Sequence, residues 1–237
     1  INTVMPMPGD EGSWSSLNVM FSTASGNVRR NHLSDFTNIK RNGKIAMKLG
    51  EGDELVGVQP CNDDDDVLMA TRNGKAIRFA ASAVRVFRGR DSTGVRGIKL
   101  LGDDRVVSMS VIAKPEQEFI LSVTENGYGK QTAFSDFPLK NRGGQGVIAI
   151  KVNGRNGRVV GAEEVADGDE LMLITGGGRL VRIRTGEIPV VGRNTQGVRL
   201  IRLAEDERLV SLGKVIEADD DSVEETSESV VDNSADS

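Results

Sequence analysis

One phrase recurs four times along this 237-residue chain at nearly constant spacing. Each copy joins a basic loop to a short segment in which apolar and charged residues alternate, as in Lys-Asn-Arg-Gly-Gly-Gln-Gly-Val-Ile-Ala-Ile-Lys-Val at 140–152. The copies end at Leu49, Leu100, Val152 and Leu203, in steps of 51, 52 and 51 residues. A fixed period near fifty residues indicates a propeller, a solenoid or a related array, in which each unit packs mainly on its neighbours.

A glycine turn also repeats once in each unit. Gly26, Gly74, Gly127 and Gly178 each follow a hydrophobic run that ends in threonine, and two of the turns read Asn-Gly. Asn-Gly between two β-rich runs is a strong hairpin signal, because both turn residues adopt positive φ. Each unit therefore contains a predicted β-hairpin.

The unit that ends at Leu203 contains four predicted strands, at 159–162, 171–175, 180–184 and 198–203. Four short strands in about fifty residues are typical of a propeller blade. We therefore expect an all-β, propeller-like partial ring over residues 1–216. Its blades would span about 18–49, 50–100, 101–152 and 153–203, with partial strands at both ends. The final run, 209–212, needs a partner in either the preceding blade or the first blade.

The net charge of −5 hides an uneven distribution. Residues 217–237 hold nine acidic residues and no lysine or arginine, whereas residues 1–216 hold 26 acidic and 30 basic residues, a net charge of +4. Because the tail is also rich in serine and poor in apolar residues, we expect 217–237 to be disordered. The mildly basic β body suggests a nucleic-acid-binding surface, for which the acidic tail would compete.

Basic residues recur at three positions of the repeat. They lie in the loop before the closing segment, in the closing segment itself (Lys48, Lys99, Lys151 and Arg202), and four residues after the turn glycine. In the third unit Gln131 occupies the last of these positions, and a lysine precedes it. Because the units are related by rotation, equivalent residues would lie on one rim. Lysine and arginine on a curved rim neutralise the phosphates of a bent duplex without reading its sequence.

The predicted DNA contacts combine these repeated positions with neighbouring basic residues. They are Arg29, Arg30, Arg41, Lys44, Arg78, Arg88, Arg90, Lys99, Lys130, Lys140, Arg142, Arg182, Arg193 and Arg202. Any single member can equally be the solvent face of an amphipathic strand. The hypothesis rests on the repetition at a fixed phase.

Motifs for catalysis or metal binding are absent from the sequence. His32 is the only histidine and has no marked serine or cysteine partner. The single cysteine, Cys61, excludes an internal disulfide and is expected in a loop. The run 63–66 of four aspartates lacks the alternating ligands of a calcium loop, so we interpret it as a solvated hairpin loop. Tyr128, the only tyrosine, is expected in a hairpin turn away from any arginine or acidic cluster that would activate it. No apolar run approaches the length of a membrane span.

Three phrases carry a resemblance to a known family. They are Thr-Gly-Val-Arg-Gly-Ile-Lys-Leu at 93–100, Asn-Gly-Tyr-Gly-Lys at 126–130 and Val-Gly-Arg-Asn-Thr-Gln-Gly-Val at 191–198. Together with the acidic tail, they are similar to the C-terminal domain of the DNA gyrase A protein, in the type IIA topoisomerase family. The resemblance covers essentially all of residues 1–216. It implies a β-pinwheel, normally of six blades that exchange strands, which wraps duplex DNA around its rim and carries no catalytic residue or cofactor.

The resemblance also implies the setting of the domain. The whole enzyme is an A2B2 heterotetramer of the gyrase A and gyrase B proteins. It uses ATP and Mg²⁺ to introduce negative supercoils, and it is cytoplasmic and associated with the bacterial nucleoid. The family's seven-residue box, Gln-Arg-Arg-Gly-Gly-Lys-Gly, is not found here. The segment 140–146 matches it only at Arg142, Gly143, Gly144 and Gly146. We therefore expect this chain alone neither to cleave DNA nor to close a six-bladed ring.

Two alternatives remain open. The topoisomerase IV counterpart resembles the gyrase domain but wraps DNA weakly and has fewer blades, and the regular repeats and acidic tail favour gyrase. A propeller-type scaffold for protein interactions would share the repeat but would not bind DNA at low salt.

Overall fold

Four β-hairpins, one from each repeat, form the centres of four antiparallel sheets. The computed structural model describes residues 5, 7, 9–37, 41, 43–113 and 119–215. The hairpins are β1 (Asn18–Thr23) with β2 (Asn27–His32), β4 (Asp66–Thr71) with β5 (Lys75–Ala80), β8 (Phe119–Thr124) with β9 (Tyr128–Ala133), and β12 (Glu170–Thr175) with β13 (Leu180–Arg184). Their turn glycines have φ between 79° and 87°, the left-handed region that a side chain disfavours.

Each of the first three sheets is completed by two strands from outside its own repeat. Sheet A has the order β3-β1-β2-β6, sheet B β10-β5-β4-β7 and sheet C β11-β8-β9-β14. The long added strands are β3 (Leu55–Cys61), β7 (Val106–Ile112) and β11 (Val159–Val165), and the short ones are β6 (Val95–Arg96), β10 (Val147–Ile148) and β14 (Val198–Arg199). The sheets therefore do not coincide with the expected blade bounds, and neighbouring repeats exchange strands, as the family resemblance implies. The repeat 50–100 gives its hairpin to sheet B and its first and last strands to sheet A, and pairing with a neighbour's strands leaves no open hairpin edge.

Sheet D has three strands, in the order β13-β12-β15. The final strand, β15 (Leu209–Lys214), pairs with β12 and so joins the preceding hairpin, one of the two partners that the sequence left open. Among the described residues β13 has no second neighbour, and Leu180 at its start is 59% exposed.

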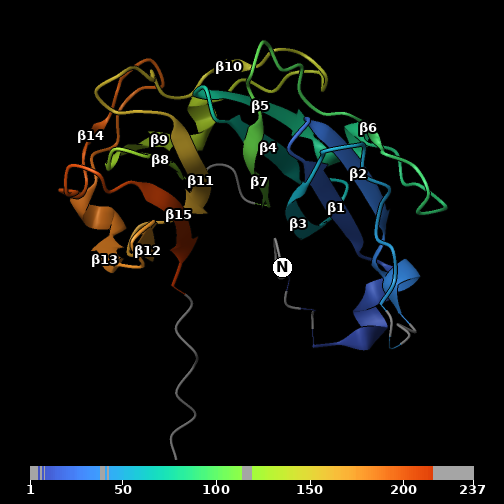
Figure 1. Cartoon of the computed structure of the whole chain (residues 1–237). Helices are drawn as coiled ribbons and strands as arrows, with labels where there is room; N and C mark the ends of the chain where they lie inside the picture. The colour runs from blue at the N-terminus through green and yellow to red at the C-terminus, as the bar shows by residue number, and fades with distance from the viewer. Residues whose placement is uncertain are drawn as a thin grey trace, which may run out of the picture.

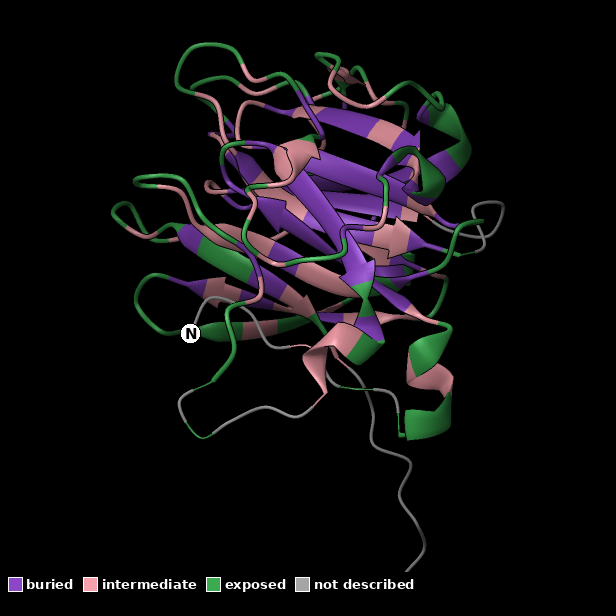
Figure 2. Cartoon of the chain, turned by 90° about the vertical axis from the view of Figure 1, so that its right-hand side faces the viewer, coloured by how far each residue is buried: buried purple, intermediate pink, exposed green. Residues whose placement is uncertain are grey.

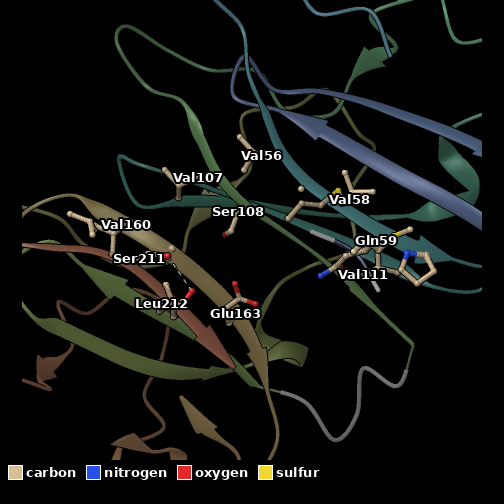
Figure 3. Close-up of a pocket in the computed structure, with 16 residues that line it drawn as sticks. Val56, Val58, Gln59, Val107, Ser108, Val111, Val160, Glu163, Ser211 and Leu212 are labelled. Atoms are coloured by element: carbon tan, nitrogen blue, oxygen red, sulfur yellow. Dashed lines mark hydrogen bonds between the residues drawn. The ribbon is translucent and has the colours of Figure 1, made fainter. Parts of the chain in front are cut away.

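The four sheets follow one another around an open arc (Figure 1). The long strands β3, β7, β11 and β15 face the centre, whereas the short strands β6, β10 and β14 lie on the convex outer side. The predicted all-β, propeller-like architecture is thus confirmed. Figure 3 shows the central hollow, with a volume of about 750 Å³, which the four long strands line. There, Val111 N on β7 donates to Gln59 Oε1 on β3 at 2.6 Å and links sheet B to sheet A.

The hydrophobic cores lie between neighbouring sheets. Met20, Met69 and Ile98 belong to the core between sheets A and B, and similar clusters fill the spaces between sheets B and C and between sheets C and D. Each inner sheet is therefore covered on both faces. Strands β4 and β8 are accordingly buried at five consecutive residues instead of alternate ones, and the buried residues concentrate in the strands of Figure 2.

The outer face of sheet A is covered by two short 3₁₀ helices. These are η1 (Glu11–Ser15) and η2 (Leu33–Phe36), and Trp14 of η1 packs against the cluster that contains Val19 and Phe21. The partial strand expected at the N-terminal end is not found among the described residues there. Asp10 caps η1 instead, through a 2.9 Å hydrogen bond that Gly12 N donates to its carboxylate.

Three more 3₁₀ turns follow the second strands of the last three hairpins. They are η3 (Ala81–Ala83), η4 (Phe134–Asp136) and η5 (Thr185–Glu187). Carbonyl groups in or next to two of these turns accept hydrogen bonds from Arg78 and Gln131. No helix in the described part of the chain is long and apolar enough to cross a membrane. The acidic tail, 217–237, lies outside the described residues.

Candidate nucleic-acid interface

The closing segments, 44–49, 95–100, 147–152 and 198–203, carry exposed basic side chains. Lys48, Lys99, Lys151 and Arg202 occupy equivalent positions in them, and all four are exposed. The last three follow the short strands β6, β10 and β14, which mark the convex side of the arc (Figure 1). We call these four residues the rim cations.

Backbone hydrogen bonds fix the last three closing segments to the tips of hairpins. The carbonyl oxygens of Gly26, Gly74 and Gly127 each accept a 2.8 Å hydrogen bond, from the N–H groups of Gly97, Ala149 and Leu200 respectively. In each case the next residue, an isoleucine, donates to the same oxygen at 3.2–3.3 Å. A side chain on Gly74 would meet Ile150 O at 2.2 Å, so the glycine permits both the turn and this close approach. Lys99, Lys151 and Arg202 are thereby held at a constant offset from the hairpins.

The loop arginines link neighbouring repeats through their side chains. Arg90 donates to Ile45 O, Arg142 to Arg96 O and Arg193 to Ile148 O, with N···O distances of 2.9–3.0 Å. Because each acceptor belongs to the closing segment of the preceding repeat, the three guanidinium groups act as equivalent clamps. All three side chains remain partly exposed, so a DNA contact is compatible with this role.

The position four residues after the turn glycine connects one blade to the next. Arg78 donates to Phe137 O at 3.1 Å, forms an ion pair with Asp66 and stacks on Phe134 at 4.2 Å. Gln131 takes the same role one blade later, because its Nε2 donates to Thr185 O and Ile188 O at 2.7 and 2.8 Å. A neutral glutamine serves here as well as an arginine, so this position holds adjacent blades together.

The other two residues that lie four positions after a turn glycine, Arg30 and Arg182, also form contacts within the protein. Arg30 is 4% exposed and forms an ion pair with Asp63, while Arg182 is exposed but pairs with Glu170. Asp66 also pairs with an arginine, and Asp65 is buried. The run 63–66 is therefore only partly the solvated loop that the sequence predicts.

Three predicted contacts are buried, and for these the prediction is wrong: Arg30, described above, Lys130 and Arg29. Lys130 is 0% exposed, and its Nζ donates to Gly192 O and Arg193 O at 2.7 and 2.6 Å. Burial lowers the pKa of Lys130 to about 8. Arg29 is 1% exposed, and its guanidinium donates to Asn31 Oδ1 at 2.8 Å and to Ser92 O at 2.6 Å. None of the three side chains reaches a phosphate unless the packing of the blades opens.

The remaining predicted contacts are exposed. They are Arg41, Lys44, Arg88 and Lys140, of which Lys44 donates to Thr37 O at 2.9 Å. Together with the rim cations and the loop arginines, they form the candidate nucleic-acid interface.

Sequence reasoning missed an arginine cluster around Tyr128. Arg155 Nε and Arg199 Nη2 donate to Tyr128 Oη at 3.2 and 2.9 Å, and these hydrogen bonds lower the pKa of the phenol. The expectation that Tyr128 lies away from arginines is therefore wrong. The signal was present in the repeat: the residue after the turn glycine pairs with the short outer strand, and this register sets Tyr128 opposite Arg199.

The described residues offer no site for a metal or a nucleophile. They contain no group of three or more His, Cys, Asp or Glu side chains arranged to hold a metal ion. His32 is exposed. Cys61 ends strand β3 instead of lying in a loop, and burial raises the pKa of its thiol to about 12, so it is a poor nucleophile.

Comparison with protein families gives one match over most of the chain. The model of the DNA gyrase C-terminal domain, a β-propeller, matches residues 17–62, 65–113, 118–166 and 169–215. Each matched segment joins a hairpin to the long strand that pairs with it, so the family repeat follows the observed sheets.

Individual relatives agree with this match. The DNA gyrase A protein of Salmonella typhimurium is 53% identical over 205 residues, which cover 86% of this chain and 23% of the relative. The gyrase A protein of Rickettsia bellii is 39% identical over 272 residues, covering 95% of this chain and 30% of the relative. The chain thus spans less than a third of the length of these relatives.

Two solved structures share the fold. A DNA gyrase A C-terminal domain superposes with a TM-score of 0.76 at 29% identity, covering 85% of this chain and 67% of the other. The C-terminal domain of a DNA topoisomerase IV gives a TM-score of 0.78 at 25% identity, covering 84% and 62%.

Proposed function

The chain belongs to the DNA gyrase C-terminal domain family, and from this premise we propose that it binds duplex DNA without sequence preference and bends it around its outer rim. The observation that carries the proposal is the repeated placement of the rim cations. Lys99, Lys151 and Arg202 are exposed at equivalent positions, and the same pair of backbone hydrogen bonds anchors each of their segments. Regularly spaced cations on a convex surface favour a polyanion that follows the curve.

Several features of the rim support a contact with the DNA backbone instead of the bases. Lys99, Lys151 and Arg202 lie on short closing segments that begin with two-residue strands. The described chain has no long helix or long β-ribbon on the rim of the kind that reads bases in the major groove of DNA. Bending a duplex of 20–30 base pairs costs about 1–6 kcal/mol, so many phosphate contacts must act together. The three anchored segments, the exposed Lys48 and the loop arginines Arg90, Arg142 and Arg193 provide such a set.

In the whole protein we propose that this domain serves a DNA topoisomerase without taking part in cleavage. By bending DNA it would present a second segment to the cleavage core and so support negative supercoiling. The catalytic residues, ATP and Mg²⁺ would then act elsewhere in a cytoplasmic A2B2 gyrase assembly.

A binding titration tests the first part of the proposal. A random-sequence duplex of about 40 base pairs is titrated with the chain at 50 and 200 mM salt, and two unrelated sequences are compared. We expect tight binding at low salt, similar affinity for both sequences, and a steep loss of affinity at the higher salt. Absence of binding at low salt would exclude a DNA-binding role and favour a protein scaffold.

A topology experiment tests the bending. A nicked circular plasmid is saturated with the chain, sealed with ligase and freed of protein. A domain that wraps DNA changes the linking number in proportion to the amount bound. An unchanged linking number at saturation would leave binding without wrapping.

A further inference from the structure

A concave pocket on the rim of sheet C gathers four arginines around the only tyrosine of the chain. The pocket has a volume of about 400 Å³ and is lined by Tyr128, Arg155, Arg199, Arg202 and Arg208, among others. One of these arginines, Arg202, is a rim cation, so the pocket is continuous with the candidate nucleic-acid interface.

Tyr128 holds two of the guanidinium groups close to each other. Its hydroxyl oxygen accepts from Arg155 at 3.2 Å and from Arg199 at 2.9 Å, and both guanidinium carbons lie over the ring, 5.1 and 5.3 Å from its centroid. The tyrosine is only 4% exposed, so its ring is a fixed platform. Two like charges repel, and the shared hydroxyl and the ring face offset part of that repulsion.

The charges in the pocket are not neutralised by the protein. Within the described residues, no carboxylate forms an ion pair with Arg155, Arg199 or Arg202. The acid that lines the pocket, Glu207, is already paired with Arg179 and accepts from Ala204 N. Arg78 on β5, by contrast, forms an ion pair with Asp66.

The tyrosine is specific to this blade. The equivalent residue after the turn glycine is Asn27 in sheet A and Lys75 in sheet B. In sheet B the residue that faces Lys75 from the outer strand is Ile148, where sheet C has Arg199. The rotation that makes the rim cations equivalent therefore does not repeat this pocket.

We propose that this pocket is a preformed site for one phosphate group of a DNA backbone, with Arg155, Arg199 and Arg202 as ligands and Tyr128 as the residue that positions them. The inference rests on the proposed DNA-binding function and deepens it. A guanidinium presents a planar fork of donors that matches a phosphate, and three such groups around one concavity exceed the neutralisation that a single exposed lysine offers. The rim then has one strong anchor point among weaker, equivalent contacts.

The test compares single variants in the same duplex-binding titration at low salt. Arg199→Gln is expected to weaken binding about 10-fold, whereas Lys99→Gln, which removes one solitary rim cation, weakens it about 3-fold. Arg184→Gln is the matched control, because it removes the same charge from the end of the β12–β13 hairpin opposite the turn, and it should leave affinity unchanged.

Tyr128→Phe separates positioning from packing, because it keeps the buried ring and removes only the hydroxyl. We expect about a 3-fold loss of affinity at unchanged thermal unfolding temperature. In the Tyr128→Phe/Arg199→Gln double variant the two losses should not multiply, because the hydroxyl acts through the arginine. Simple multiplication of the two effects would contradict the positioning role.

A competition experiment distinguishes the source of the phosphate. At constant ionic strength, inorganic phosphate replaces chloride and is expected to weaken duplex binding of the wild-type chain more than that of Arg199→Gln. If free phosphate saturates the pocket at micromolar concentration, the site serves a small phosphorylated ligand and the proposed DNA role is overturned. If wild type binds duplex but Arg199→Gln behaves like Lys99→Gln, the anchor is overturned while the general DNA-binding function stands. If wild type does not bind duplex at all, the proposed function itself fails.

Discussion

The cations of the hairpins and the cations of the closing segments share a charge but have different environments. On β2, β5 and β9, Arg30, Arg78 and Lys130 are wholly or largely buried and bind protein carbonyls or carboxylates. On the closing segments, Lys99, Lys151 and Arg202 are exposed, and their backbones are held by the protein. The first group links blades, and the second is available to an external anion. A basic residue that recurs at the same position of each repeat therefore marks equivalent sites, but the recurrence does not show whether its side chain is buried or exposed.

The largest effect should come from removing the rim cations together. With Lys48, Lys99, Lys151 and Arg202 all replaced by glutamine, we expect duplex affinity at low salt to fall about 100- to 1,000-fold and the salt dependence to become shallower by about 3 in the log–log slope. The free energy of unfolding, measured in urea, should change little because none of these side chains is buried. Unchanged DNA affinity would show that the exposed cations of the closing segments do not bind DNA.

Replacing the buried Lys130 is expected to lower the stability of the protein and to leave its DNA affinity nearly unchanged. Lys130→Met leaves Arg193 O without its donor and Gly192 O with only the hydroxyl of Thr195, and should lower the free energy of unfolding by about 2–4 kcal/mol. Urea titrations of this variant and of the exposed control Lys99→Met measure the difference. The folded fraction of Lys130→Met should keep its DNA affinity within about 2-fold. A stable variant that has lost DNA binding would instead return Lys130 to the interface.

The central hollow supplies a third environment, in which a partly buried carboxyl group forms no ion pair within the described residues. Glu163 lies on the wall of the hollow near Ser211 and Leu212 (Figure 3), and burial raises its pKa to about 7 from an ordinary 4.5, with Lys214 opposing the shift. A raised pKa means that the folded state binds the proton more tightly. The free energy of unfolding should therefore fall as pH rises from about 4.5 to 7 and stay lower above that range.

Glu163→Gln removes this dependence. At pH 8 the variant should be more stable than wild type by about 2 kcal/mol, and at pH 4 the two should be similar. Urea unfolding at both pH values provides the measurement. If wild type is the more stable protein at pH 8, the ionised carboxylate has a stabilising partner and the hollow is more polar than its valines suggest.

The period and the hairpins could be predicted because the signals are local. Gly74 and Gly127 adopt the positive φ that Asn-Gly turns require, and the runs before them become β4 and β8. The exchange of strands could not be read from the residues themselves. The sequence of a two-residue strand such as Val95–Arg96 does not identify the hairpin with which it pairs. The packing of neighbouring repeats selects β2 as its partner.

The rim cations are exposed, as a DNA contact requires, whereas the hairpin residues Arg29, Arg30 and Lys130 are buried. In a sheet with one solvated face, alternation shows which side chains point outward. Here sheets A to C are each packed on both faces, and β9 is buried at five consecutive residues, so the pattern gives no warning that Lys130 points inward. The Tyr128 pocket was missed because Arg155 and Arg199 belong to the following repeat, and their convergence depends on the same exchange.

Strand exchange would also have a mechanical consequence for the proposed bending of duplex DNA. A pull on Lys99 acts on the segment 95–100, which is paired with β2 in sheet A but continues through the chain into β7 of sheet B. Load applied at one point on the rim is therefore shared between two sheets. Recoil of bent DNA would work against interlocked units rather than against single blades, so detachment of a blade would require breaking contacts on both of its sides.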